Sequence, residues 1–209
     1  MVSVALESSS ELFIHVPKVA GGSISRALLA RPDATRYAVT DMKSAEPCVS
    51  QLQQHLPEPI SSYTSTACVR NPWDWAVSGY LHVSENMPAY NSPPSFRDFV
   101  LGDWDLASEN PYPSKFSNPV TYVAYHTQIS QWEHLGGREG IETIDHICRF
   151  ESLESDLAKT GLPITELPHI HKSERRSHYS DYFDQELIEL VRVQNEELLE
   201  FFGYEFESS

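Results

Sequence analysis

The chain has 209 residues, of which 40% are hydrophobic and 11% aromatic. These values are typical of a globular chain that buries its own core, so we expect a single domain over residues 1–209 and exclude a disordered or fibrous protein. The formal net charge of −15 argues against nucleic acid as a partner, because an acidic surface repels a polyanion. A small anionic ligand is compatible with this charge, since a few donors suffice to bind it.

The three cysteines, Cys48, Cys68 and Cys148, show neither CxxC nor Cys/His spacing. An odd number without such spacing predicts neither a disulfide framework nor a metal site, and favours a reducing cytoplasm. The N-terminus lacks a basic segment followed by a long apolar stretch, and no run approaches about 18 apolar residues. We therefore expect no secretion signal and no integral membrane association. The oligomeric state stays open.

Three apolar runs, each followed by a helical pattern, predict the fold class. The runs and the helices expected after them are 12–16 and 23–30, 63–69 and 72–82, and 144–150 and 151–162. Pro72 suits a first helical turn, and Gly161 suits a helix end. Repeated strand-then-helix units are typical of a parallel sheet with helices packed on it. We predict an α/β protein with three layers, α/β/α, around a central parallel sheet.

The region from 83 to 119 differs in character, because prolines interrupt it and only a short helix over 95–102 is expected. Its aromatic side chains either line a ligand pocket or pack in the core, and the sequence does not separate these alternatives. They are Tyr90, Phe96, Phe99, Trp104, Tyr112 and Phe116. Residues 183–206 have near-helical apolar spacing, which predicts one amphipathic helix ending at Gly203.

The segment HVPKVAGGS, residues 15–23, lies between a predicted strand and a predicted helix. Backbone N–H groups at a helix start, close approach at glycine and the charge of Lys18 together suit a phosphate or sulfate group. A plain tight turn explains the glycine pair equally well. The segment does not fit the Walker A pattern, because Lys18 precedes Gly21 and Gly22.

Two longer segments make the chain resemble a known family. FIHVPKVAGGSI is similar to the 5'-phosphosulfate loop of cytosolic and carbohydrate-type sulfotransferases, commonly written PKTAGTS. CVRNPWDWAVSGY is similar to their 3'-phosphate motif, with an Arg before Asn-Pro and a Ser eight residues later. RFESLESDL resembles a strand-end segment of the family, and HKSERRSHYSDYF with the later FGY resembles its nucleotide-covering loop and closing helix. The resemblance is weakest over residues 30–60 and 83–120, and it implies a P-loop-like architecture.

The resemblance also implies a co-substrate, 3'-phosphoadenosine 5'-phosphosulfate, and the product 3'-phosphoadenosine 5'-phosphate. Lys18 would be catalytic, because it would stabilise the bridging oxygen as the bond to sulfur breaks. The implied nucleotide-binding residues are Pro17, Lys18, Gly21, Gly22, Ser23, Ile24, Arg70, Ser78, Lys172, Ser173 and Arg176, with Arg175 in the same basic stretch. The alternatives are a surface ion pair for Arg70, a backbone-bonded hydroxyl for Ser78, and a solvated loop for 172–176.

The sequence departs from the family pattern in the first motif. Val19 and Gly22 stand where Thr is usual, so two hydroxyl donors are missing, and Trp75 replaces a common Arg. Each lost hydrogen bond to a charged group would cost about 1.5–3 kcal/mol of donor binding.

The general base that accepts the acceptor's proton is not evident. His55 is the first choice, because an imidazole accepts a proton near neutral pH. The alternatives are Asp41, Glu46 and His15.

The function implied by the resemblance is in-line transfer of a sulfuryl group to a hydroxyl or amine of a small-molecule or carbohydrate acceptor, without a metal. Two alternatives are open. One is a nucleotide kinase or NTPase of P-loop architecture. The other is a catalytically weak, sulfotransferase-like nucleotide-binding module.

Overall fold

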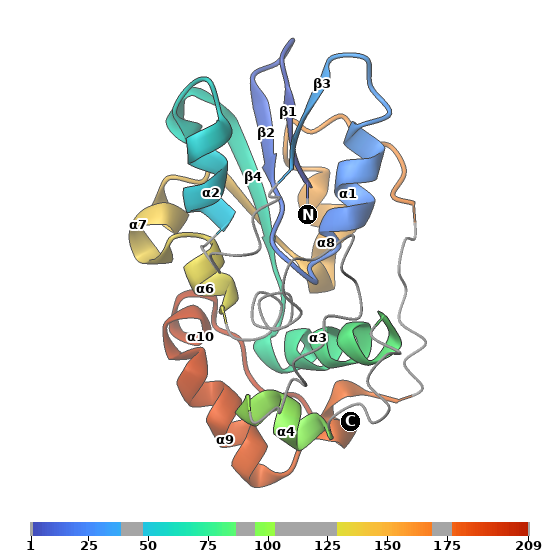
Figure 1. Cartoon of the computed structure of the whole chain (residues 1–209), viewed down its shortest axis with the longest axis vertical. Helices are drawn as coiled ribbons and strands as arrows, with labels where there is room; N and C mark the ends of the chain where they lie inside the picture. Colours follow the sequence, from blue (N-terminus) through green and yellow to red (C-terminus); the bar gives the residue numbers. More distant parts are fainter. Residues whose placement is uncertain (1, 39–47, 87–94, 103–128, 169–176, 209) are drawn as a thin grey trace, which may run out of the picture. The chain divides into compact units, whose positions relative to one another are not determined.

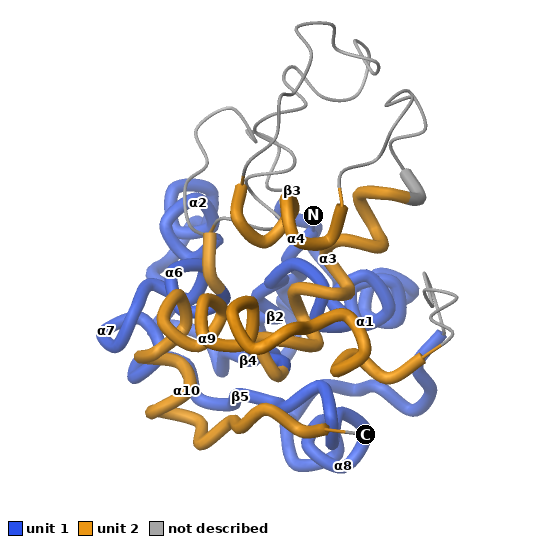
Figure 2. The backbone as a smooth tube through the Cα atoms, turned by 90° about the horizontal axis from the view of Figure 1, so that it is seen from below, with its two compact units in different colours: residues 1–40, 46–70, 131–172 blue, residues 41–45, 71–130, 173–209 orange. Residues whose placement is uncertain are grey.

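The structure, a computed structural model, describes residues 2–38, 48–86, 95–102, 129–168 and 177–208 (Figure 1). The chain divides into two compact units (Figure 2). The first comprises residues 1–40, 46–70 and 131–172, and the second comprises residues 41–45, 71–130 and 173–209. Each unit is therefore assembled from segments that lie far apart in the sequence.

A five-stranded sheet forms the centre of the first unit, counted over the described residues (Figure 1). β2, β4 and β5 pair in parallel, whereas β1 pairs antiparallel with both β2 and β3. In spatial order the strands are β3 (Ala34–Ala38), β1 (Val2–Leu6), β2 (Glu11–Ile14), β4 (Thr64–Val69) and β5 (His146–Arg149).

The prediction of a parallel sheet is confirmed for the three apolar runs and wrong for the sheet as a whole. The turn over residues 7–10 that joins β1 to β2 is too short for a crossover, so these two strands must run antiparallel. Ser10 takes a positive φ of 54° in this turn. The sheet is therefore mixed and mostly parallel, with an N-terminal hairpin that the sequence analysis did not predict.

Helices flank the sheet of the first unit. α1 packs against β1, α2 against β2, and α8 against β5. Leu12, Phe13 and Ile14 of β2 are all fully buried, and because successive strand side chains point to opposite faces, both faces of β2 are covered. The helices are α1 (Gly21–Leu28), α2 (Cys48–His55), α6 (Gln131–His134), α7 (Gly137–Glu142) and α8 (Leu153–Leu157), with the 3-10 turns η1 (Ile60–Ser62) and η2 (Phe150–Ser152).

A side-chain clamp fixes the pairing of β4 with β5 at their amino ends. The N–H and Oγ of Ser65 donate to Asp145 Oδ2 at 2.8 and 3.1 Å, and the Asp145 N–H donates to Ser65 Oγ at 3.2 Å. The backbone bond from Ser65 lowers the pKa of the Asp145 carboxyl, because it stabilises the ionised form. The register that follows pairs Thr66 with His146 and Val69 with Arg149.

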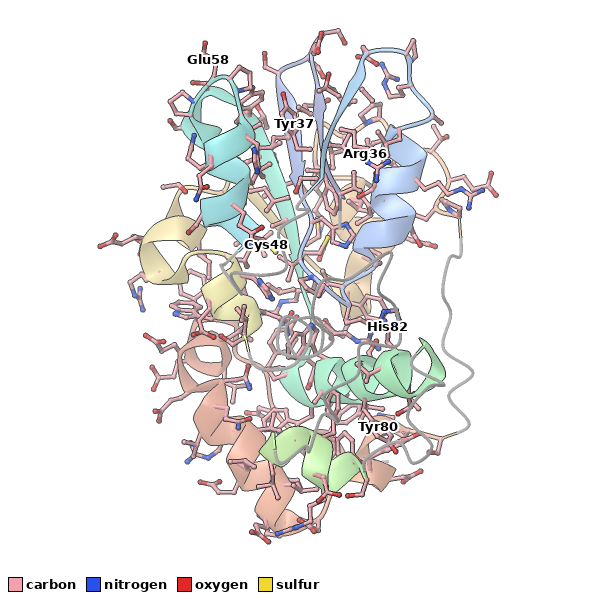
Figure 3. The ribbon with its side chains drawn as sticks, in the orientation of Figure 1. Arg36, Tyr37, Cys48, Glu58, Tyr80 and His82 are labelled. Carbon is pink, nitrogen blue, oxygen red and sulfur yellow. The ribbon has the colours of Figure 1, made fainter. Side chains whose placement is uncertain are left out.

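The second unit is helical and has an aromatic core. Its described elements are α3 (Pro72–Asn86), α4 (Phe96–Leu101), η3 (Tyr179–Tyr182), α9 (Gln185–Gln194) and α10 (Glu196–Phe202). Tyr80 points from α3 toward α4, with ring centroids 5.4 Å from Phe96 and 5.5 Å from Phe99, whereas His82 lies on the opposite side of α3 (Figure 3). Phe96 and Phe99 are thus core residues. The other four aromatic residues named for a ligand pocket, Tyr90, Trp104, Tyr112 and Phe116, lie outside the described residues.

The predicted helix over 72–82 is confirmed as α3, which continues to Asn86. Pro72 occupies its first position, where a missing N–H costs nothing. Asn71 sits just before it, and its Oδ1 accepts the Trp73 N–H at 3.1 Å. The short helix expected over 95–102 is confirmed as α4.

The prediction of a single C-terminal helix is wrong, because two helices, α9 and α10, occupy this segment. Asn195 separates α9 from α10 with φ −124° and ψ 21°, outside the helical region. Its Nδ2 donates to the Val191 carbonyl at 2.9 Å, a local side-chain bond of the kind by which Asn competes with helical hydrogen bonding. The predicted end at Gly203 is confirmed, with φ 66°.

Over the part of the chain that the structure describes, no helix combines the length and the apolar character needed to cross a membrane.

We expect Ser65→Ala to lower the free energy of unfolding by about 1–2 kcal/mol, because it removes two hydrogen bonds of the β4–β5 clamp from a buried position. Urea denaturation followed by circular dichroism measures this. Ser61→Ala, at an exposed serine of η1, is the control and should stay close to the wild type. Equal stability of the two variants would show that the clamp contributes nothing.

Candidate functional site

Three parallel strands of the first unit end at one edge of the sheet. β2 ends at Ile14, β4 at Val69 and β5 at Arg149. Because the carboxyl ends of parallel strands meet at a common edge, the residues that follow them come together there. These are the β2–α1 loop (residues 15–20), Arg70 and Phe150, and the edge they form is the candidate site (Figure 1).

The β2–α1 loop has an unusual backbone. Lys18 and Ala20 both take positive φ angles, 62° and 64°, which are uncommon for residues other than glycine. Such strain, about 1–3 kcal/mol per residue, clusters at ligand-binding segments. The loop therefore has the backbone expected of an anion-binding turn, although it carries no glycine at either strained position.

The loop delivers the chain to the start of α1, where donor groups are available. Ala20 caps the helix, and its carbonyl accepts the N–H groups of Ser23 and Ile24 at 3.0 and 3.2 Å. The N–H groups of Gly21 and Gly22 have no hydrogen-bond acceptor among the residues that the structure describes. The first turn of α1 also contains no acidic residue. A helix start of this kind attracts an anion.

His15 supports this helix start from inside the unit. Its ring is buried, and its Nδ1 lies 3.2 Å from the Val2 carbonyl oxygen and 3.3 Å from Ser25 Oγ. Gly21 packs directly on the ring, since a Cβ at position 21 would lie 2.7 Å from its Nε2 and Cδ2 atoms. Burial lowers the pKa of His15 to about 3, so the imidazole is neutral at physiological pH.

Lys18 and Arg70 are brought together in the structure. Arg70 is 8% exposed, and its Nη1 donates to the Lys18 carbonyl at 3.2 Å. Its guanidinium carbon lies 3.9 Å from the centroid of the Phe150 ring. The main chain of Arg70 is held as well, because its N–H donates to Gln131 Oε1 at 2.8 Å and Gln131 Nε2 donates to its carbonyl at 2.9 Å.

The other predicted nucleotide-binding residues fall into three groups. Pro17, Ser23 and Ile24 are buried beside Lys18 and Gly21 at the β2–α1 junction. Ser78 belongs to the second unit, in the second turn of α3, where it is 8% exposed. Outside the described residues lie the residues of the basic stretch, Lys172, Ser173, Arg175 and Arg176, and the base alternatives Asp41 and Glu46.

His55 is not brought to this edge. It is the exposed last residue of α2, and α2 is followed by η1 and then by the amino end of β4. The Gln53 side chain accepts the Ile60 N–H at 3.0 Å, which ties the end of α2 to η1. Lys18 and Arg70 lie beyond the carboxyl ends of β2 and β4, at the other end of these strands.

Two residues of the site were missed as contributors. The sequence indicates no role for Phe150 beyond its place in the strand-end segment RFESLESDL. Its position beside Arg70 follows once β4 and β5 are paired in register. Gln131 carried no sequence signal, since its role depends on a contact across 61 positions of the chain. In the described ranges no group of three His, Cys, Asp or Glu side chains is arranged to hold a metal ion.

Comparison with known proteins gives one match. A family model described as "Sulfotransferase family" matches residues 7–205. No curated protein and no solved structure matches the chain. The matched range includes the β2–α1 loop, Arg70 and Phe150, so the residues that meet at this edge all lie within the family's sequence pattern.

We expect Gly21→Ala to destabilise the protein by about 1–3 kcal/mol and Gly22→Ala to leave it unchanged or stabilise it by up to about 1 kcal/mol. A Cβ at position 21 would meet the buried His15 ring, whereas a Cβ at position 22 meets nothing within 4 Å. Chemical denaturation of both variants measures the difference. Equal effects would contradict the packing of Gly21 on His15.

We expect His15 to make stability depend on pH. The unfolded chain takes up a proton at this residue near its ordinary pKa of 6.5, and the folded chain does so only near pH 3. The stability that the neutral ring contributes is therefore complete above about pH 6.5 and is lost as the pH falls toward 3.

The measurement is the difference in unfolding free energy between the wild type and His15→Asn at several pH values. We expect the difference to be largest at pH 7 and to shrink on acidification. His55→Asn, at an exposed histidine, is the matched control. A difference for His15→Asn that does not vary with pH would refute the neutral, buried state of the ring.

Proposed function

The chain belongs to the sulfotransferase family, and on that premise we propose that it transfers a sulfuryl group from 3'-phosphoadenosine 5'-phosphosulfate to a hydroxyl or amine of a small-molecule or carbohydrate acceptor. The observation that carries the proposal is the hydrogen bond from the Arg70 guanidinium to the main-chain carbonyl of Lys18, at 3.2 Å, beside an α1 start whose first N–H groups are available. The donor is an anion at both of its phosphate groups. A protein with a net charge of −15 therefore needs local cations and N–H groups of this kind to bind it.

The architecture we propose is P-loop-like, with three layers, and the β2–α1 loop takes the place of the phosphate-binding loop. Two features support this. The loop connects a strand with covered faces to a helix on the sheet, and the left-handed residue Ala20 directly precedes the helical residue Gly21, an alternation typical of anion-binding backbone turns. The residue after Gly22 is Ser23 and not a lysine, which distinguishes this loop from the Walker A loop of nucleoside triphosphatases.

In the proposed reaction, the acceptor oxygen or nitrogen forms a bond to sulfur while the bond from sulfur to the 5'-phosphate oxygen breaks. That oxygen leaves with the bonding electrons as part of 3'-phosphoadenosine 5'-phosphate, and the acceptor's proton passes to a general base. Lys18 stabilises the charge that develops on the leaving oxygen. Arg70 binds the 3'-phosphate, and the N–H groups of Gly21 and Gly22 bind the 5'-phosphate. Ser78, which belongs to the second unit, stays a proposal for the 3'-phosphate from the sequence resemblance alone.

The positions of His55 and His15 in the first unit bear on the proposal for the general base. His55 lies at the far end of the parallel strands from Lys18. His15 is buried under Gly21, with a pKa lowered to about 3 by that burial, so it is a weak base enclosed in the core. The sequence-based alternatives Asp41 and Glu46 stay proposals for the base, and both lie outside the described residues.

We also propose a cytoplasmic location, the expectation drawn from the cysteines. All three are free thiols, and all three are buried. The acceptor is proposed only by class.

We expect the wild type to bind 3'-phosphoadenosine 5'-phosphate and to bind ATP with magnesium much more weakly, as isothermal titration calorimetry would measure. We expect Lys18→Ala to lower donor hydrolysis or transfer by about 100-fold or more, because it removes a charge that acts on the leaving group. Radiolabelled donor provides the assay. Lys159→Ala is the matched control, since Lys159 is an exposed lysine paired with Asp156.

Each result separates one alternative. Preference for ATP with magnesium would refute the proposal in favour of a kinase or NTPase. Tight binding of 3'-phosphoadenosine 5'-phosphate without hydrolysis, and without transfer to any member of a broad acceptor panel, would identify a nucleotide-binding module that lacks turnover.

A further inference from the structure

Two contacts of different kinds with described residues orient the Arg70 side chain. Its guanidinium carbon lies over the Phe150 ring, 3.9 Å from the ring centroid. Its Nη1 donates to the Lys18 carbonyl at 3.2 Å. Arg70 is 8% exposed, and a buried side chain that makes both a ring contact and a hydrogen bond has few rotamers left.

We propose that Phe150 is a positioning residue for Arg70 and thereby sets the preference of the site for a nucleotide that carries a 3'-phosphate. The proposal rests on the proposed function, because it takes Arg70 as the 3'-phosphate ligand. It adds a residue that does not itself contact the nucleotide.

The chemistry of arginine gives the ring this role. A guanidinium binds phosphate through N–H groups at its edge, in a planar fork. The Phe150 ring lies against the guanidinium carbon and carries no oxygen or nitrogen acceptor, so it packs on Arg70 without accepting a conventional hydrogen bond from these N–H groups. The ring also attracts the cation through its electron-rich face. Phe150 therefore orients Arg70 without competing with the ligand.

The backbone places Phe150 for this task. Val69 and Arg149 are paired residues of β4 and β5, so Arg70 and Phe150 are the next residues along two strands in register. Gln131 makes a two-point hydrogen bond to the N–H and carbonyl of Arg70, at 2.8 and 2.9 Å, and is fully buried. Gln131 thus fixes the main chain of Arg70, and Phe150 fixes its side chain.

The preference for the 3'-phosphorylated nucleotide follows from the phosphate that each group of the protein is proposed to bind. The 3'-phosphate distinguishes 3'-phosphoadenosine 5'-phosphate from adenosine 5'-phosphate, and both compounds share the 5'-phosphate that the α1 start would bind. Loss of the Phe150 ring removes one of the contacts that orient Arg70 and leaves the α1 donors in place. Only the contribution of the 3'-phosphate should then decrease.

The experiment compares the dissociation constants of these two nucleotides for the wild type, Phe150→Leu and Phe150→Tyr. We expect Phe150→Leu to lose about 2- to 30-fold of the preference for the 3'-phosphorylated nucleotide, the range expected for a cation–π contact, with unchanged affinity for adenosine 5'-phosphate. Phe150→Tyr keeps the ring and should keep the preference.

Phe99→Leu is the matched control, because it removes an aromatic ring from the core of the second unit and should leave the preference intact. If Phe150→Leu fails to fold, Phe150→Met takes its place, since methionine fills the volume without a π face. Equal loss for both nucleotides would show a merely structural role and overturn the proposal. A full preference retained in Phe150→Leu would overturn it too.

These failures are distinct from failure of the proposed function. A wild type that binds both nucleotides equally well would overturn the assignment of Arg70 to the 3'-phosphate, and the role of Phe150 with it. A wild type with a clear preference that Phe150→Leu retains would overturn the positioning role alone.

Discussion

The parallel register of β2, β4 and β5 is the constraint on which the candidate site depends. Ile14 pairs with Ala67 and Val69 pairs with Arg149, so the β2–α1 loop, Arg70 and Phe150 all leave the sheet at one edge. Side chains alternate between the faces of a strand, so a slip of one residue between β4 and β5 would turn Phe150 away from the face that carries Arg70. The bonds between Ser65 and Asp145 at the amino ends oppose such a slip, about five residues from the groups whose position they determine.

The start of α1 depends on a second constraint, the close approach of Gly21 to the buried His15 ring. The neutral ring, held near the Val2 carbonyl and Ser25, provides a surface on which the first turn of α1 rests. This explains why the two adjacent glycines are not equivalent. Gly21 is required by packing inside the protein, whereas Gly22 is exposed and faces open space, as expected of a position that meets a ligand. A charged imidazole would carry a desolvation cost here, so the support is suited to the neutral form.

How far the sequence predicts this molecule depends on the range of each interaction. Local patterns predict the three apolar runs and their helices, and the rule for parallel strands predicts that the runs end at a common edge. The sequence therefore suffices to predict that Lys18 and Arg70 lie close together. The antiparallel hairpin of β1, the pairing of Gln131 with Arg70 and the stacking on Phe150 depend on contacts between distant segments that no local pattern encodes. The break at Asn195 and the position of His55 at the end of α2 do not follow from the sequence, because apolar periodicity and residue type do not specify where a helix ends or which end of a sheet it meets.

The departures from the family pattern in the β2–α1 loop have a different meaning once the fold is known. Val19 and Gly22 both replace a usual threonine, and from the sequence they look like two lost donors of equal weight. In the structure the Val19 side chain is fully buried, so a hydroxyl there would enter the core and need a partner inside it. Gly22 is the position where a hydroxyl would meet open space beside the α1 start. The loop therefore lacks one hydroxyl that could donate a hydrogen bond to the ligand, and not two. The hydrogen bond from Arg70 to the Lys18 carbonyl joins the two proposed phosphate-binding elements, which are Arg70 and the β2–α1 loop. Groups coupled in this way are expected to act non-additively, so the weight of each departure depends on whether Arg70 stays in place.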